Sequence, residues 1–212
     1  MMNESKLNVR MLHLMESGFF GKQKLNEDES GTKYDAIFVA GLTRDVGIDG
    51  QVGYFKKGFG SNAKVAAFDH TGAPHGHDMT IAQVFASNPK IPAFLFSQGC
   101  EMSQVVASSG NADPSKVYII EPFFGKGQTV KPKIDAALGR GVPSSNVYVA
   151  NYANAGKGVL CKPNDTDSDG LCGATATKSG NHYSAVTEVA GKHKQSKGFS
   201  GGGGGQYRDI MY

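Results

Sequence analysis

The feature that most constrains the fold is a series of short apolar runs separated by helical patterns and turns. The clearest apolar runs occupy residues 34–40, 63–68, 92–96, 117–120 and 147–150, and a sixth covers 158–161. Helical patterns occur at 79–86, 101–108, 133–138 and 184–194. Short buried strands that alternate with helices are typical of an α/β domain with a mostly parallel central sheet. The Gly-rich segment 45–60 and the segment 69–77 are predicted to be loops.

The chain has 212 residues, a length that suits one domain. Residues 1–33 are predicted to form a polar N-terminal extension, and residues 34–195 the α/β domain. Residues 196–212 include five consecutive glycines, Gly201–Gly205, and are predicted to be a flexible C-terminal tail.

Charge and hydropathy exclude several classes of partner. The net charge is only +3 and the 22 basic residues are scattered, so no nucleic acid is expected as a partner. No apolar stretch reaches the roughly 18 residues of a membrane helix, so no membrane span is expected. The first 31 residues lack the continuous apolar run of a signal peptide, which favours an intracellular chain or one without its leader. We expect a monomer.

The most informative motif follows the apolar run 92–96. Ser97 comes directly after the predicted strand, Gly99 follows two residues later, and a helical pattern begins at once. This order is the plan of a nucleophile elbow, a tight strand-to-helix turn that exposes a serine hydroxyl and turns the next N–H, here that of Gln98, toward an oxyanion. Leu95 stands where such elbows usually have glycine, so an ordinary strand–helix turn is the alternative.

A second stretch could complete a catalytic triad. Asp169 lies between Cys161 and Cys172, and His182 follows. The chain order Ser97, Asp169, His182 is that of α/β-hydrolases, in which the acid orients the imidazole and the imidazole accepts the serine proton. Pairing of two of the three cysteines would indicate an oxidising compartment.

These two stretches together resemble the cutinase family, which includes cutin hydrolases and acetylxylan esterases. Residues 95–99, Leu-Phe-Ser-Gln-Gly, are similar to that family's Gly-Tyr-Ser-Gln-Gly, and residues 169–172, Asp-Gly-Leu-Cys, match its Asp-x-x-Cys. The turn Gly41-Leu-Thr43 looks like the family's Gly-Ser-Thr turn at the end of the first core strand. The resemblance covers about residues 34–190. The segment 129–158 and the loop between the cysteines are longer than in the family, and the family's N-terminal disulfide is missing.

The resemblance implies a three-layer α/β-hydrolase fold and a serine esterase that needs no cofactor and no metal. Ser97, Asp169 and His182 would form the triad, and Gln98 with Leu42 or Thr43 the oxyanion hole. A Cys161–Cys172 disulfide and secretion are also implied. The substrate would be a carboxylic ester: a cutin-like polyester, a short-chain lipid or an acetylated sugar. Two alternatives stay open, another acyl hydrolase such as a carboxylesterase or thioesterase, and a non-catalytic binding or effector protein that retains the fold.

Other roles are open for several residues. The segment Asp165–Gly170 matches the opening of a calcium-binding loop, but Ala176 occupies the position of its bidentate glutamate. His75 and His77 could bind a metal, although a solvated turn is the favoured interpretation. Cys100 is a rival nucleophile, with a buried structural thiol favoured. Glu121, at the end of an apolar run, is a rival acid.

Overall fold

The computed structural model describes residues 32–122, 130–150, 175–178 and 182–194. The chain divides into two units between Lys33 and Tyr34, and every helix and strand below belongs to the second unit. The predicted N-terminal extension up to residue 31, the predicted tail and the predicted sixth strand at 158–161 lie outside the described residues.

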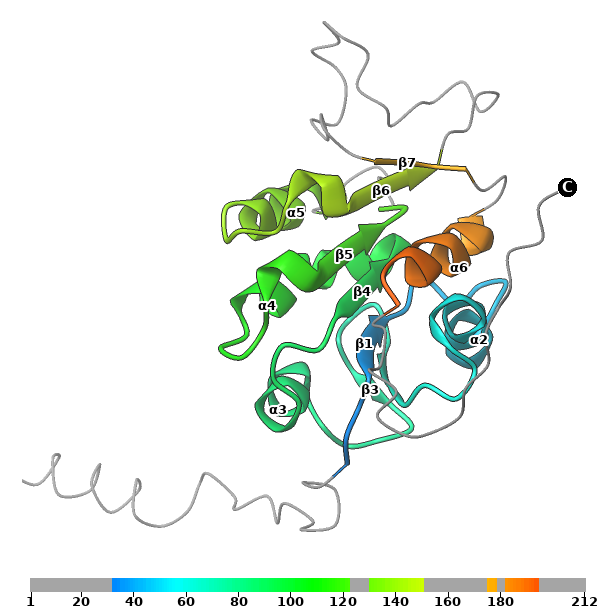
Figure 1. Cartoon of the computed structure of the whole chain (residues 1–212), viewed down its shortest axis with the longest axis horizontal. Helices are drawn as coiled ribbons and strands as arrows, with labels where there is room; N and C mark the ends of the chain where they lie inside the picture. The colour runs from blue at the N-terminus through cyan, green and yellow to red at the C-terminus, as the bar shows by residue number, and fades with distance from the viewer. Residues whose placement is uncertain (1–31, 123–129, 151–174, 179–181, 195–212) are drawn as a thin grey trace, which may run out of the picture. The chain divides into compact units, whose positions relative to one another are not determined.

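The strands form one mostly parallel sheet, which confirms the predicted α/β class (Figure 1). Its order is β3-β2-β1-β4-β5-β6-β7, and all neighbours pair in parallel except β2 and β3. The strands are β1 (Ala36–Val39), β2 (Val65–Phe68), β3 (Pro74–His75), β4 (Ala93–Phe96), β5 (Val117–Ile120), β6 (Val147–Ala150) and β7 (Thr175–Thr177).

Helices cover both faces of this sheet (Figure 1). They are α2 (Ile48–Phe59), α3 (Ile81–Ser87), α4 (Ser103–Ser108), α5 (Val130–Leu138) and α6 (His182–Lys192), with 3-10 turns η1 (Ser97–Met102), η2 (Pro114–Lys116) and η3 (Ser144–Asn146). None of the helices in the described part of the chain is long and apolar enough to cross a membrane.

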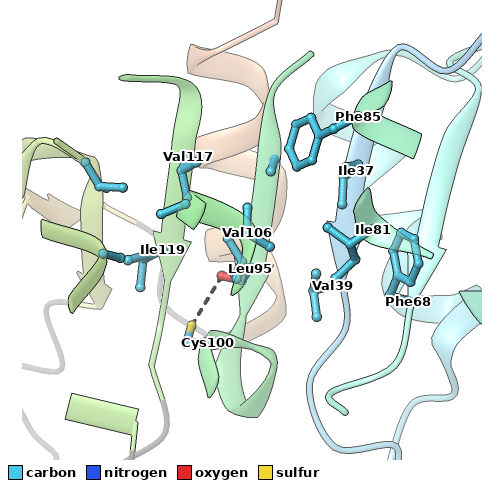
Figure 2. Close-up of a cluster of buried hydrophobic side chains, with 14 of the residues drawn as sticks. Ile37, Val39, Phe68, Ile81, Phe85, Leu95, Cys100, Val106, Val117 and Ile119 are labelled. Atoms are coloured by element: carbon cyan, nitrogen blue, oxygen red, sulfur yellow. Dashed lines mark hydrogen bonds between the residues drawn. The ribbon is translucent and has the colours of Figure 1, made fainter. Parts of the chain in front are cut away.

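Alternation along the strands divides the core between the two faces. In β4, Ala93 and Leu95 belong to a cluster with side chains from α3, α4 and α5 (Figure 2). Phe94 and Phe96 belong to a second cluster with side chains from α2 and α6. Because both faces of the sheet are buried, its strands consist of continuous apolar residues, as expected for a parallel sheet.

The prediction of a loop over residues 45–60 is wrong, because residues 48–59 form helix α2. Its three glycines lower helix propensity, but Phe55 and Phe59 bury on the sheet and hold the helix in place. Gly58 has a packing role, since a Cβ atom there would overlap the carbonyl oxygen of Thr187 in α6. Close packing of α2 on α6 therefore outweighs the local preference for a loop.

Smaller differences concern the ends of elements. The helix predicted at 101–108 is preceded by the 3-10 turn η1, which begins at Ser97 itself. The predicted loop 69–77 contains the short antiparallel strand β3, and the edge strand β7 was not predicted. His182 is the first residue of α6 rather than part of a preceding loop.

Candidate active site

Ser97 lies at the carboxyl end of β4 with an unusual backbone conformation. Its φ is +53°, in the left-handed region that non-glycine residues seldom adopt. The strand ends at Phe96 and the turn η1 starts at Ser97, so the change from strand to helical turn occurs at the serine. Such a strained strand-to-helix turn is the geometry of a nucleophile elbow.

Two glycines allow this turn to pack against the end of β1. A Cβ atom on Gly99 would lie 2.5 Å from the carbonyl oxygen of Ala40 and 2.7 Å from that of Val39. A Cβ atom on Gly41 would lie 2.6 Å from Cβ of Ser97 and 3.1 Å from its Oγ. The three distances below 3.0 Å are shorter than a real Cβ atom tolerates, so the residues after β1 and the turn after β4 pack in direct contact. The side chain of Leu95, which replaces the usual glycine, is fully buried in the core instead.

Cys100 is buried beneath the elbow, as the favoured interpretation held. Its thiol is completely inaccessible and donates weakly to the carbonyl oxygen of Leu95, with Sγ and O 3.4 Å apart (Figure 2). Burial raises the pKa of the Cys100 thiol, and the nearby carboxylate of Glu121 raises it further. Because the thiolate is the nucleophilic form, this environment disfavours Cys100 as a nucleophile.

His182 lies beside the elbow at the start of α6. Its ring packs on that of Phe96, the residue before Ser97, with 4.4 Å between the centroids. Its Nδ1 lies 3.4 Å from Oε2 of Glu121, a long hydrogen bond. The imidazole thus has one nitrogen directed at a carboxylate and leaves Nε2 for another partner.

Glu121 directly follows β5, as Ser97 directly follows the neighbouring strand β4. Phe96 pairs with Ile120 in the sheet, so Ser97 and Glu121 are the next residues of two adjacent parallel strands. Glu121 also has a left-handed backbone, with a φ of +49°. Its side chain is only 5% exposed, and its Oε1 has no hydrogen-bond partner among the described residues. The sequence presented this residue only as a rival acid.

Asp169, the acid implied by the family resemblance, lies outside the described residues, as do Cys161, Cys172 and the calcium-like segment 165–170. Among the described residues, His182 contacts Glu121 and Phe96, the residue before Ser97, and no hydrogen bond joins His182 to Ser97 itself.

The predicted oxyanion residues lie on the loop between β1 and α2. Leu42 is partly buried and Thr43 is exposed, directly after Gly41 with its contact to Ser97. Gln98, the other predicted donor, follows Ser97 in η1. Gln51 of α2, which sequence reasoning missed, is fully buried and hydrogen-bonded to this loop.

The two histidines of the hairpin after β2 have local partners. Nε2 of His75 lies 2.9 Å from Asp49 Oδ1. His77 donates from Nε2 to the carbonyl oxygen of Ala67, and its Nδ1 accepts from the N–H of Met79. Within the described ranges, no group of three or more His, Cys, Asp or Glu residues could hold a metal ion.

Comparisons of the chain with protein-family models, with curated proteins and with solved structures returned no match.

Proposed function

We propose that this protein is a serine hydrolase that cleaves carboxylic esters with Ser97 as its nucleophile. The observation that carries the proposal is the left-handed backbone of Ser97 at the end of β4, with His182 and Glu121 at the same edge of the sheet. Strained backbone at a non-glycine residue has a free-energy cost and concentrates at functional sites. The resemblance to the cutinase motif around Ser97 supports the same function.

In this mechanism Ser97 Oγ attacks the ester carbonyl carbon while His182 Nε2 takes the hydroxyl proton. The new Oγ–C bond gives a tetrahedral intermediate, whose negative charge is held by the N–H groups of Gln98 and of Leu42 or Thr43. The intermediate collapses, the bond to the alcohol breaks, and His182 gives its proton to the departing alkoxide. Water then attacks the acyl-enzyme by the same route and releases the acid.

In this proposal Glu121 accepts the Nδ1–H of His182 and stabilises the imidazolium form, supported by the distance of 3.4 Å between Nδ1 and Oε2. A buried carboxylate in this role fixes the tautomer and ring orientation that the proton transfers need. The family resemblance implies Asp169 for this role. If Glu121 is the acid, replacing Glu121 should lower turnover and replacing Asp169 should not; if Asp169 is the acid, the reverse is expected.

The substrate is proposed to be an ester with an accessible acyl group, such as a polyester, a short-chain lipid or an acetylated sugar. A thioester substrate on the same site is the second acyl class, and paired kinetic measurements on matched ester and thioester substrates separate the two.

Labelling with a fluorophosphonate probe and peptide mapping tests the proposal. We expect the probe on Ser97 in the parent protein and no labelling in Ser97→Ala. Ser103→Ala is the matched control, because Ser103 is a buried serine on the next turn whose hydroxyl donates to the Cys100 carbonyl oxygen. A folded parent protein that neither reacts with the probe nor hydrolyses short chromogenic esters would instead support a non-catalytic binding protein.

A further inference from the structure

We infer that Gln51 is a positioning residue for the oxyanion hole: its side-chain amide holds the loop between Gly41 and Val46 in the shape that the reaction requires. This inference rests on the proposed function. The side chain of Gln51 extends from the first turns of α2, and no part of the residue is exposed.

All the polar contacts of this amide go to one loop. Oε1 of Gln51 accepts the Gly41 N–H at 2.8 Å, and Nε2 donates to the carbonyl oxygens of Leu42 at 3.1 Å and Val46 at 2.9 Å. A primary amide carries two N–H donors, and here both are used on this loop. Hydrogen bonds to one buried side chain therefore hold this loop in its shape.

The same loop is in contact with the nucleophile. Gly41 lies against Ser97, since a Cβ atom on it would meet the serine Cβ and Oγ. The carbonyl oxygen of Ala40, one residue earlier, lies against Gly99 of the elbow. Gln51 thus fixes the loop at the point where it leaves Ser97 and again at Val46, next to the start of α2.

These contacts also select which N–H groups can serve an oxyanion. The Gly41 N–H is already donated to Gln51, so it is not available. A trans peptide directs its N–H opposite to its C=O. Because the Leu42 carbonyl is turned toward Gln51, the N–H of Thr43 in the same peptide is directed away from Gln51. The N–H groups of Leu42 and Thr43, the two residues predicted for this arm of the oxyanion hole, are not used by Gln51 and stay the candidate backbone donors. Preorganised donors stabilise a developing oxyanion because they need not reorient during the reaction.

Kinetics of Gln51→Met test the inference, since methionine keeps the length and volume of the side chain and removes all three hydrogen bonds. Loss of one oxyanion donor costs about 100-fold or more in turnover. In Gln51→Met the oxyanion donor is displaced with its loop rather than removed, so the loss should be smaller. We expect kcat for a p-nitrophenyl ester to fall by roughly 10-fold with little change in KM. A trifluoromethyl ketone, which forms an oxyanion on the serine, should bind more weakly by a similar factor.

Asn146→Leu is the matched control, because Asn146 is also a buried amide that hydrogen-bonds to backbone carbonyl groups. Nδ2 of Asn146 donates to the carbonyl oxygens of Ser115 and Val117, where β5 and β6 begin, at the opposite edge of the sheet from Ser97. We expect it to lower the melting temperature without lowering kcat or inhibitor affinity. Comparable losses of kcat in both variants would show a general loss of structure and overturn the inference.

If Gln51→Met does not fold, Gln51→Glu is the second test variant. The glutamate keeps an acceptor for the Gly41 N–H and loses the Nε2 donors. Unchanged kcat in a folded variant overturns the role of Gln51 while Ser97 labelling in the parent still supports the esterase. Failure of the parent to label at Ser97 overturns both.

Discussion

Oε2 of Glu121 lies 3.4 Å from Nδ1 of His182, although 61 positions separate the two residues along the chain. The carboxylate reaches this place because Glu121 follows β5 in a left-handed conformation, as Ser97 follows β4. Among the described residues, Lys90 is the other non-glycine residue with positive φ. Two of these three left-handed residues thus lie at the ends of adjacent strands. Because such backbone strain costs free energy, this clustering favours a functional reason for it.

Glu121→Gln is predicted to lower kcat by about 10⁴, the scale seen when the acid of a triad becomes an amide. The amide can present its N–H to Nδ1 and so favour the wrong imidazole tautomer. Steady-state kinetics on a short chromogenic ester, with circular dichroism for folding, provide the measurement.

Asp169→Asn and Glu188→Gln are the comparisons for that variant. Glu188 is a carboxylate on the same helix as His182, and it accepts from the Lys178 N–H and pairs with Lys192. We expect both comparison variants to remain within a few-fold of the parent. A 10⁴-fold loss in Asp169→Asn with none in Glu121→Gln would return the acid to the place that the cutinase resemblance implies.

Gly41→Ala is predicted to abolish fluorophosphonate labelling of Ser97. The added methyl group would lie 2.6 Å from the serine Cβ, so either the loop or the elbow has to move. Gly47→Ala tests the same loop without this clash, because a Cβ atom at Gly47 meets nothing within 4 Å and its φ is −60°. Equal labelling rates in the two variants would contradict the close contact between Gly41 and Ser97.

The sequence predicted those parts of the fold that depend on local pattern. The strands β1, β2, β4, β5 and β6 lie within the predicted apolar runs, and Ser97, Gln98 and Gly99 form the predicted turn. Helix α2 was missed because its glycines fit a loop locally, and the close contact that requires one of them, Gly58 against α6, depends on tertiary packing.

The partners of the site could not be read from local pattern. Glu121 becomes relevant only when β4 and β5 are paired so that Phe96 lies opposite Ile120. Gln51 is an ordinary polar residue in the sequence, and its role appears when its burial and its three contacts to residues 41–46 are known. Such relationships depend on tertiary packing, which no spacing along the chain records.

The predicted Cys161–Cys172 disulfide is tested by counting thiols in denatured, unreduced protein. Cys100 is a free, buried thiol, so one reactive thiol is expected after unfolding and three after reduction. A bridge that closes a loop of about a dozen residues is expected to contribute ~3 kcal/mol to stability, mainly by restricting the unfolded chain. Three thiols before reduction would contradict both the bridge and the expectation of secretion into an oxidising compartment.

His193, just beyond the end of α6, is predicted to make stability depend on pH. Its Nε2 lies 2.5 Å from the hydroxyl of Tyr148, and its ring stacks on Tyr118 with 4.0 Å between the centroids. Burial lowers the pKa of His193 below its ordinary value of 6.5, and the positive charge of Lys192 lowers it further. His193 therefore binds a proton less readily in the folded protein than in the unfolded chain, where its imidazole titrates near pH 6.5.

The sign follows from this difference in proton binding. The stabilising contribution of neutral His193 is fully present above pH 6.5 and is lost as the pH falls toward the lower pKa of the folded state. Urea unfolding between pH 8 and pH 5 should show the free energy of unfolding decreasing below pH 6.5. His193→Phe keeps an aromatic ring against Tyr118 and removes the titrating group, so its decrease should be smaller than that of the parent. An unchanged decrease in His193→Phe would assign the acid sensitivity to another group.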